Sequence, residues 1–254
     1  MAIIEARNLS KVFLQPKEET KHFQVLDNIS FTIKSGEFIT LFGPNGCGKT
    51  TLLNIISGIE NPSSGEVLIN RKGPELVKIG FVFQNYNESM LPWRTAIGNI
   101  EFALEIQNIP KEKRKYIAED VLRKVSLLEY KDKFFYELSG GMKQLIAICR
   151  AFAYDPEILL MDEPFSSLDY STTRKMELEL LNIWRETSKT TLFVSHDIDE
   201  AIFLADRVIV LSKRPAKIKE IINVDLPRPR ELKMLSSKSF FEIRRVILKV
   251  FECE

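Results

Sequence analysis

The sequence predicts an α/β fold with a mainly parallel sheet, and the spacing of its apolar residues leads to this prediction. Short apolar runs of four or five residues, bounded by glycine, proline or serine, occur before residue 84 and again after residue 157. Such runs are typical of buried strands. From residue 96 to residue 154 the apolar residues recur every three or four positions, which indicates helices. Because strands that alternate with helices favour parallel pairing, the helical region is interpreted as an insertion into the sheet.

Each expected element follows from its own run of residues. Seven strands are predicted, in chain order: Ile29–Ile33, Phe38–Phe42, Val67–Asn70, Ile79–Phe83, Ile158–Met161, Thr191–Ser195 and Arg207–Leu211. A helix is expected to open with Thr51–Ile56, directly after a glycine-rich turn. A longer amphipathic helix is expected over Tyr170–Thr187.

The last part of the chain predicts a further helix. Prolines and arginines at positions 214–215 and 227–230 mark a connector, and Ser239 and Glu242 are then spaced like a capping box. Apolar residues follow at helical spacing: Phe240, Ile243, Ile247 and Phe251. We therefore expect a C-terminal helix that packs on the core. A membrane-surface or regulatory helix is the alternative.

The composition excludes several classes of protein. Among 254 residues, 36 Lys and Arg balance 35 Asp and Glu, which argues against nucleic-acid binding through a basic surface. No apolar run approaches the ~20 residues needed to span a bilayer, and the first residues do not resemble a secretory signal. Three scattered cysteines, Cys47, Cys149 and Cys253, argue against a disulfide scaffold and favour a reducing compartment.

Residues 43–50 read GPNGCGKT, which matches the phosphate-loop pattern G-x-x-x-x-G-K-[ST] between a predicted strand and a predicted helix. Glycines let the backbone curl around an anion, and the helix N-terminus adds the positive end of its dipole. Lys49 supplies a positive charge for terminal phosphates, and Thr50 a hydroxyl for Mg²⁺. The residues expected to contact phosphate are Gly43, Pro44, Asn45, Gly46, Cys47, Gly48, Lys49, Thr50 and Thr51. A plain glycine turn is the alternative.

The apolar run Ile158–Met161 ends in two acids, Asp162 and Glu163. A buried strand that ends in carboxylates delivers them to the sheet edge at which ligands of α/β sheets bind. We expect Asp162 to hold Mg²⁺ and Glu163 to orient or deprotonate an attacking water. The alternative is a solvated acidic turn before Pro164.

Residues 138–144, LSGGMKQ, resemble the signature sequence of the ATP-binding cassette (ABC) ATPases, and they lie between the phosphate loop and the acidic strand as in that family. Gln84 resembles the family's Q-loop glutamine, Ser166–Asp169 its D-loop and His196 its switch histidine. The resemblance covers roughly residues 3–230. For His196 alone, a surface or capping role is the alternative.

The resemblance implies a P-loop NTPase fold of the ABC type, with an antiparallel β subdomain and an inserted α-helical subdomain. It implies an ATPase domain over residues 1–230, with a core of about 1–84 and 155–215, a helical subdomain of about 85–154 and a helical tail over 231–254. It also implies that ATP and Mg²⁺ are the cofactors. The catalytic residues implied are Lys49, Gln84, Glu163 and His196. Those implied around Mg²⁺ are Thr50, Gln84 and Asp162.

In this family two copies pair head to tail. The resemblance therefore implies a homodimer in which ATP held by one copy is completed by residues of the other: Ser139, Gly140, Gly141 and Asp169. An aromatic residue near the N-terminus stacks on adenine in the family. Phe13 is the expected one, and Phe23 competes with it because residues 15–24 resemble an inserted charged loop. An apolar core role is open for either ring.

The sequence departs from the family pattern at three positions. Met142 stands where the signature usually has Gln, and Leu145 and Cys149 replace an Arg and an Ala common in the following helix. We expect the packing of that helix to differ and its contact with phosphate to be kept. Cys47 is interpreted as a small filler residue near a helix N-terminus, a position that lowers the pKa of a thiol.

Residues 87–100, 213–218 and 226–230 resemble the nitrate, sulfonate and taurine importer branch of the family. This resemblance implies an ATP-hydrolysing subunit that energises an importer for one of these or a related small solute. It implies integral-membrane permease subunits as partners and, indirectly, an extracytoplasmic solute-binding protein. The chain would be peripheral, at the cytoplasmic face of the inner membrane. Leu91 and Trp93 are expected to line a groove for a permease helix, or else to belong to the core.

Two other functions keep the same phosphate motifs. An ABC ATPase of DNA repair or translation normally adds a coiled coil, a zinc module, a second cassette or a basic surface, and the sequence shows none of these. Lys111–Lys115 is interpreted as a solvated helix face, so no nucleic-acid partner is expected. A catalytically inactive regulatory module is the third possibility, and the intact Lys49, Asp162, Glu163 and His196 argue against it.

Overall fold

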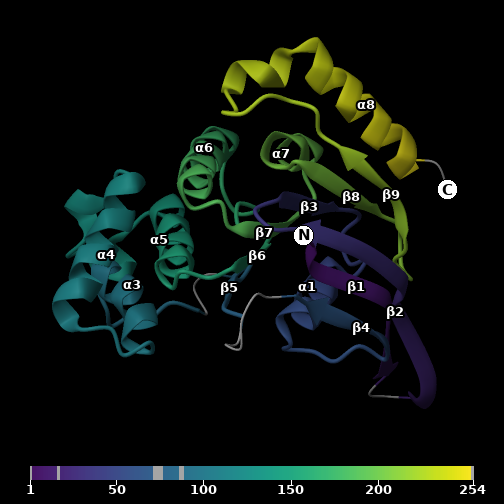
Figure 1. The fold of residues 1–254 in the computed structure, drawn as a ribbon, viewed down its shortest axis with the longest axis horizontal. Helices are drawn as coiled ribbons and strands as arrows, with labels where there is room; N and C mark the ends of the chain where they lie inside the picture. The colour runs from purple at the N-terminus through teal and green to yellow at the C-terminus, as the bar shows by residue number, and fades with distance from the viewer. Residues whose placement is uncertain (1, 16–17, 71–76, 86–88, 253–254) are drawn as a thin grey trace. The chain divides into compact units, whose positions relative to one another are not determined.

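The computed structural model describes residues 2–15, 18–70, 77–85 and 89–252 (Figure 1). They form two compact units, one made of Met1–Val77 with Thr190–Glu254 and the other of Lys78–Lys189. Residues 87 and 88 of the importer-like stretch, and Cys253, lie outside the described residues. The units group residues differently from the core and helical subdomain expected from the sequence, and those domain limits stay a prediction.

The first unit contains a layer of buried, mainly parallel strands. Its strands are β3 (Phe38–Phe42), β7 (Thr190–Ser195), β8 (Arg207–Leu211) and β9 (Ile218–Asn223). β3 lies parallel to both β7 and β8, and β9 pairs antiparallel with β8. Continuous apolar runs form β3 and β8 because both faces of these strands are buried. The prediction of a mainly parallel sheet is confirmed.

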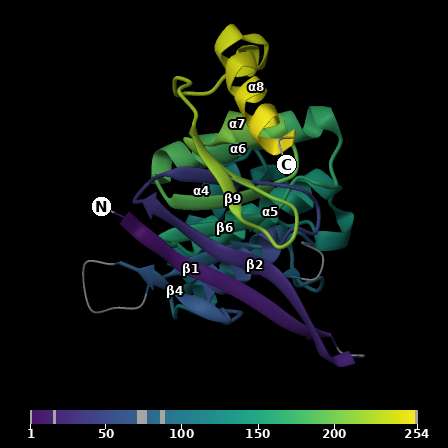
Figure 2. The same ribbon diagram turned by 90° about the vertical axis from the view of Figure 1, so that its right-hand side faces the viewer.

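A three-stranded antiparallel sheet belongs to the same unit, as the family resemblance implied. Its order is β2-β1-β4, with bounds β1 (Ala2–Gln15), β2 (Glu18–Lys34) and β4 (Ser64–Ile69). Figure 2 shows β1 and β2 as a long ribbon. The expectation of an inserted loop over residues 15–24 is wrong, because Leu14 pairs with His22 and Phe13 with Phe23. Cross-strand pairing satisfies the backbone there although the side chains are polar.

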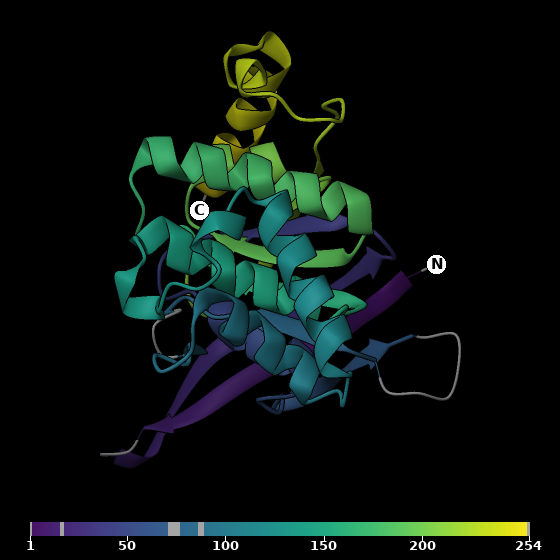
Figure 3. The same ribbon diagram turned by 90° about the vertical axis from the view of Figure 1, so that its left-hand side faces the viewer.

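The second unit combines a strand pair with a helical region. β5 (Ile79–Val82) lies parallel to β6 (Ile158–Asp162). The helices are α3 (Ala96–Glu105), α4 (Lys111–Lys124), α5 (Gly140–Ala153) and α6 (Tyr170–Thr187), with short 3-10 turns at Leu128–Tyr130 and Phe135–Glu137. Figure 3 shows the helices of this unit in teal and green, and α3, α4 and α5 pack on one another. The helices predicted between residues 96 and 154 and over Tyr170–Thr187 are confirmed.

Three helices belong to the first unit: α1 (Lys49–Ser57), α7 (Ile198–Leu204) and α8 (Lys238–Glu252), with a 3-10 turn at Leu232–Ser236 before α8. The predicted docking of α8 is confirmed, since it packs on α7, β8 and β9 with Phe240 and Ile247 buried. The capping box predicted at Ser239 is wrong. The helix begins two residues earlier, at Lys238, where the Ser237 hydroxyl accepts a hydrogen bond from the Phe240 N–H at 3.3 Å.

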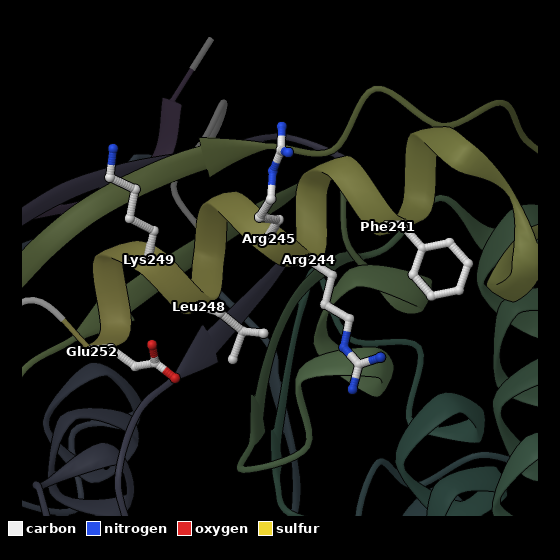
Figure 4. Close-up of a pocket in the computed structure, with 6 residues that line it drawn as sticks. All are labelled: Phe241, Arg244, Arg245, Leu248, Lys249 and Glu252. Atoms are coloured by element: carbon white, nitrogen blue, oxygen red, sulfur yellow. The ribbon is translucent and has the colours of Figure 1, made fainter.

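The last turn of α8 reaches the strand that leads into the phosphate loop. The centre of the Phe251 ring lies 5.1 Å from the centre of the Phe42 ring. The Arg244 guanidinium forms an ion pair with the Asp199 carboxylate of α7 at 3.2 Å. Figure 4 shows the side chains that line an open hollow along this helix: Phe241, Arg244, Arg245, Leu248, Lys249 and Glu252. Among the described residues, no helix is long and apolar enough to cross a bilayer.

Candidate nucleotide site

The phosphate loop connects β3 to α1 in the first unit, and two of its glycines have backbone angles that other residues avoid. The φ angle is +73° at Gly46 and +120° at Gly48. A Cβ atom on Gly48 would lie 2.7 Å from the Val25 Cγ1 atom, closer than carbon atoms approach. Only glycine fits these two positions without strain. The loop therefore has the tight curvature that a phosphate cradle requires.

Lys49 and the start of α1 supply the positive charge of this cradle. The Lys49 side chain is buried, and its ammonium donates hydrogen bonds to the carbonyls of Gly43 at 3.0 Å and Pro44 at 3.2 Å. No side chain of the described residues caps the helix at Gly48, and its first turn has no acidic residue. The N-terminal amides of a helix and a lysine ammonium are both groups that bind phosphate, so the residues fit a bound polyphosphate.

The switch histidine lies at the same sheet edge as the phosphate loop. Phe42 and Ser195 are opposite residues of the parallel strands β3 and β7, so Gly43 and His196 leave the sheet side by side. His196 is exposed. The Ser195 hydroxyl oxygen accepts a hydrogen bond from the Asp197 N–H at 2.9 Å and thereby closes a turn around His196.

Both candidate adenine residues occur in the β1–β2 hairpin as cross-strand partners. Phe13 is 36% exposed, and the Lys11 ammonium lies 4.7 Å from the centre of its ring. Phe23 is half-buried, and the Arg214 guanidinium lies 4.2 Å from the centre of its ring. Phe13 is thus accessible to a nucleobase, whereas Arg214 already covers one contact surface of Phe23.

The second unit brings the Q-loop glutamine and the two acids to one strand edge. Val82 of β5 is opposite Met161 of β6, so Gln84 and Asp162 follow at the same end of these parallel strands. Asp162 is buried, and Gln84 is exposed. Glu163 has a φ angle of +41°. Such a conformation is strained for a residue with a side chain and often occurs at functional sites.

The signature residues and the D-loop acid meet in this unit. The Ser139 hydroxyl caps α5 by accepting a hydrogen bond from the Met142 N–H at 3.3 Å. Gly141 is buried, and a Cβ atom there would lie 3.0 Å from the Thr172 Cγ2 atom of α6. The Asp169 carboxylate caps α6 through the hydroxyl and the N–H of Thr172, at 2.6 and 3.1 Å. Hydrogen bonds from Thr172 and then Ser171 hold the pKa of Asp169 well below its usual range.

The structure thus gathers the expected residues in two sets. The first unit holds Phe13, His196 and the loop residues Gly43, Pro44, Asn45, Gly46, Cys47, Gly48, Lys49, Thr50 and Thr51. The second unit holds Gln84, Ser139, Gly140, Gly141, Asp162, Glu163 and Asp169. Their catalytic and binding roles remain predictions.

The residues expected around Mg²⁺ present oxygen atoms, the ligands that this ion prefers. Thr50 offers a hydroxyl, Asp162 a carboxylate and Gln84 an amide oxygen. Among the described residues no group of three or more His, Cys, Asp or Glu could hold a metal ion. Magnesium usually keeps several waters and binds through one or two carboxylates together with substrate phosphates. The donor set fits such a nucleotide-linked ion.

The pKa values of the two buried cysteines are raised for the same physical reason. The pKa expectation for Cys47 is wrong, because burial raises the pKa of its thiol and outweighs the opposing effects of Lys49 and Arg214. Burial likewise raises the pKa of Cys149 to about 12. Cys149 and Leu145 are packed inside the helical region, and the Cys149 Sγ atom lies 3.7 Å from the Val121 carbonyl oxygen. Cys47 therefore fills space, as the sequence suggested.

Sequence reasoning missed Arg214, which donates a hydrogen bond to the Gly46 carbonyl of the phosphate loop. The pair Arg214-Pro215 was interpreted only as part of a connector. The contact joins residues 168 positions apart, and no short-range pattern reveals such a contact.

A buried strand, a glycine-rich phosphate loop and a helix that begins at lysine define a P-loop nucleotide-binding protein. The family model described as ABC transporter matches residues 26–166. The chain belongs to this family, and it is an ATPase of the ATP-binding cassette type.

Several known proteins are similar over nearly the whole chain. An uncharacterised ABC transporter ATP-binding protein of Methanocaldococcus jannaschii is 45% identical, over 99% of this chain and 96% of the relative. The aliphatic sulfonates import ATP-binding protein SsuB of Bacillus cereus is 40% identical, over 98% of this chain and 96% of the relative. The bicarbonate transport ATP-binding protein CmpD of Synechococcus elongatus is 40% identical, over 95% of this chain and 87% of the relative.

A solved structure of the same family is also similar. It is the dimeric post-hydrolysis state of the ATP-binding cassette MJ0796 bound to ADP and Pi. The TM-score is 0.75 at 32% identity, and the match covers 88% of this chain and 100% of the other.

Proposed function

We propose that this chain is the ATP-hydrolysing subunit that energises an ABC importer for nitrate, a sulfonate, taurine or a related small solute. The phosphate loop is the observation that carries the proposal, because its glycine angles and buried lysine form a cradle for a polyphosphate. The relatives named for import of sulfonates and bicarbonate support the importer branch. Both solutes are small anions.

The first unit binds the nucleotide in this proposal. The backbone amides of the phosphate loop and the N-terminus of α1 hold the phosphates, and Lys49 exchanges its two carbonyl contacts for phosphate oxygens. Thr51 follows in the first turn of the same helix. The exposed ring of Phe13 stacks on adenine. Phosphoryl transfer needs mainly such positioning and charge stabilisation.

Hydrolysis needs a base near the terminal phosphate. Glu163 orients and deprotonates the attacking water, and the strained backbone at this residue, which is common at functional sites, supports the assignment. His196, held in its turn by Ser195, senses the terminal phosphate. Thr50, Asp162 and Gln84 would hold Mg²⁺, which when bound neutralises charge on the phosphates. The positions of Asp162 and Glu163 at the end of β6, and of His196 directly after β7, support these assignments.

Two copies of the chain form the working unit in this proposal. Ser139, Gly140, Gly141 and Asp169 of one copy complete the ATP site of the other, with the N-terminus of α5 directed at the terminal phosphate. The dimeric structure of the ATP-binding cassette MJ0796 supports this arrangement. ATP then holds the two copies together, and hydrolysis followed by release of the cleaved phosphate removes the group that links them.

A rigid aromatic loop is the proposed contact with the permease. The buried Asn99 side chain accepts a hydrogen bond from the Leu91 N–H at 2.8 Å and donates to the carbonyls of Leu91 and Thr95, both at 3.1 Å. These bonds fix a loop that carries Trp93, which is 71% exposed. A rigid exposed tryptophan is a common anchor of protein interfaces. The permease would keep the chain at the cytoplasmic face of the inner membrane, and a solute-binding protein would act on the permease.

Three experiments test this function. The purified chain should bind ATP with Mg²⁺ and hydrolyse it, and a tagged copy should co-purify with an integral-membrane permease. In reconstituted vesicles, sulfonates, nitrate and bicarbonate should be compared as stimulants of the ATPase rate in the presence of the binding protein. A rate that instead rises with DNA or RNA would favour the alternative function in repair or translation.

A further inference from the structure

Arg214 lies on the connector after β8, outside every motif that defines the family site. Its guanidinium donates a hydrogen bond to the Gly46 carbonyl in the phosphate loop. The same group lies 4.2 Å from the centre of the Phe23 ring in the β1–β2 hairpin. One side chain therefore joins three separate segments of the first unit at the phosphate loop.

The segment that carries Arg214 is itself firmly held. The Ser212 N–H donates to the Lys217 carbonyl, and the Ser212 hydroxyl accepts from the Lys217 N–H, both at 2.9 Å. These bonds close a loop over residues 212–217. Ala216 then attaches this loop to β2 through hydrogen bonds with Val25 at 2.8 Å and Asp27 at 2.9 Å. Arg214 thus approaches the phosphate loop from a fixed base.

The contact falls on a peptide unit that controls the curvature of the phosphate loop. The Cys47 N–H donates to the Pro44 carbonyl at 3.2 Å, which closes a β-turn. Gly46 has the positive φ angle that a type II turn needs at its third residue. The peptide joining Gly46 to Cys47 is planar, so its carbonyl is held by Arg214 and its N–H by Pro44. Rotation of this peptide would break both bonds.

We propose that Arg214, supported by Phe23, is a positioning residue that keeps the phosphate loop in the conformation that binds nucleotide. This inference rests on the proposed binding of ATP at the loop. A loop that samples other conformations binds its ligand more weakly, in proportion to the fraction of molecules in the competent state. Arg214 therefore raises the affinity for ATP without touching the reacting atoms.

The test compares the affinity for ATP with Mg²⁺, measured by calorimetry on the full chain, between Arg214→Ala and a matched control. Lys217→Ala is that control, because it removes one positive charge from the same loop while its ammonium pairs with Asp27 at 3.0 Å and not with the phosphate loop. We expect Arg214→Ala to weaken binding about tenfold and Lys217→Ala less than about twofold. The turnover rate at saturating ATP should change less than about twofold in both, which separates positioning from catalysis.

Two further variants exclude a general loss of structure. Arg214→Lys keeps the charge but loses the planar group that stacks on Phe23, so about a threefold loss of affinity is expected. Phe23→Leu should weaken binding in the wild-type chain and add nothing in the Arg214→Ala background, because the two side chains act as one unit. The unfolding temperature without nucleotide should stay within about 2 °C of the wild type.

The possible results separate this inference from the proposed function. A chain that shows no affinity for ATP would overturn the proposed function. A wild-type chain that binds ATP, with Arg214→Ala no weaker than Lys217→Ala, would overturn the role of Arg214 alone. If Arg214→Ala does not fold, Arg214→Lys decides in its place, and affinity equal to that of Lys217→Ala would overturn the role.

Discussion

Two helix N-termini are expected to meet phosphate, and they are built differently. α1 follows two glycines with positive φ angles, has no side-chain cap among the described residues and holds the buried Lys49. α5 instead begins with an ordinary cap, in which the Ser139 hydroxyl accepts the hydrogen bond of the Met142 N–H. Ser139 and Gly140 are both exposed.

The difference shows which helix can bind nucleotide by itself. The loop before α1 is curved by its own backbone, so the cradle exists within one chain. The cap of α5 uses only one lone pair of the Ser139 oxygen, and a serine hydroxyl keeps a hydrogen that it can donate to a further acceptor. α1 is therefore expected to bind ATP alone, and α5 to recognise ATP that another copy has bound.

Glu163→Gln should have the largest effect on ATP hydrolysis. It should trap the ATP-bound dimer, in which α1 of one copy and α5 of the other contact the same nucleotide. An amide of the same shape cannot take a proton from water, so hydrolysis should fall about 1000-fold while ATP affinity stays within about twofold. Light scattering after gel filtration should then show a dimer that persists with ATP and Mg²⁺. Glu186→Gln, an exposed change on α6, should hydrolyse ATP normally. Near-normal turnover in Glu163→Gln would remove this residue from the mechanism.

Lys49→Ala tests the half of the comparison that concerns α1. Loss of a charged contact to phosphate should weaken ATP binding by about 10- to 100-fold, and the ATP-dependent dimer should disappear. Binding is measured by calorimetry on the monomer. The matched change is Lys143→Ala near the start of α5, which should leave the affinity of the isolated chain unchanged. Equal losses in the two variants would mean that α1 is not the primary site.

Ser139→Ala tests the other half. It removes the cap of α5 and the donated hydrogen together, so the ATP-bound dimer should dissociate about ten times more readily. Nucleotide affinity of the monomer should not change. The lost cap should also lower the unfolding free energy by about 1 kcal/mol. Ser139→Thr keeps the hydroxyl, so the stability of its ATP-bound dimer and its free energy of unfolding are expected to match those of the wild type. If it restores stability without the dimer, the hydroxyl serves only as a cap.

The smallest expected effect is a pH dependence of the free energy of unfolding that arises from the two buried thiols. The pKa of Cys149 is raised to about 12, whereas an unfolded thiol ionises near about 8.5. Its stabilising contribution is therefore complete below pH 8.5 and declines as the pH rises towards 12. Measured by urea unfolding, the free energy of unfolding should be about 1 kcal/mol lower at pH 9.5 than at pH 7.5. This difference should be absent in Cys149→Ala. Cys47→Ala should remove less, because Lys49 and Arg214 oppose the shift at Cys47. If the free energy of unfolding of Cys149→Ala fell by the same amount between pH 7.5 and 9.5 as that of the wild type, this account would be contradicted.

The sequence predicts the buried strands and most helices well, because their signals are local. Phe38–Phe42 and Arg207–Leu211 have the predicted bounds, and so does the helix Tyr170–Thr187. β1 and β9 were missed because polar residues interrupt their apolar pattern. Ser237 and Ser239 lie two positions apart where the last helix starts, and only the position of the first turn decides which one caps it.

The order of motifs along the chain was enough to identify the family, and it supplied the candidate residues of the site, whose roles stay predictions. The burial, backbone angles and long-range contacts of those residues could not be predicted from the sequence. The pKa of Cys47 depends on how deeply the packed loop buries it, and a sequence does not give burial. The strained φ angle of Glu163 and the contact of Arg214 with Gly46 arise from tertiary structure as well.

The close approach of Gly48 to Val25 has a consequence for saturation mutagenesis. Growth-based selection will deplete every replacement at Gly48, and this depletion is easily attributed to lost contact with nucleotide. Gly65 should show a similar depletion, since a Cβ atom there would lie 2.4 Å from the Arg7 carbonyl oxygen. Gly65 is not one of the expected site residues. Intolerance at either glycine therefore does not by itself show a lost contact with nucleotide, because an added Cβ atom would also clash with neighbouring atoms. Binding measurements separate the two causes.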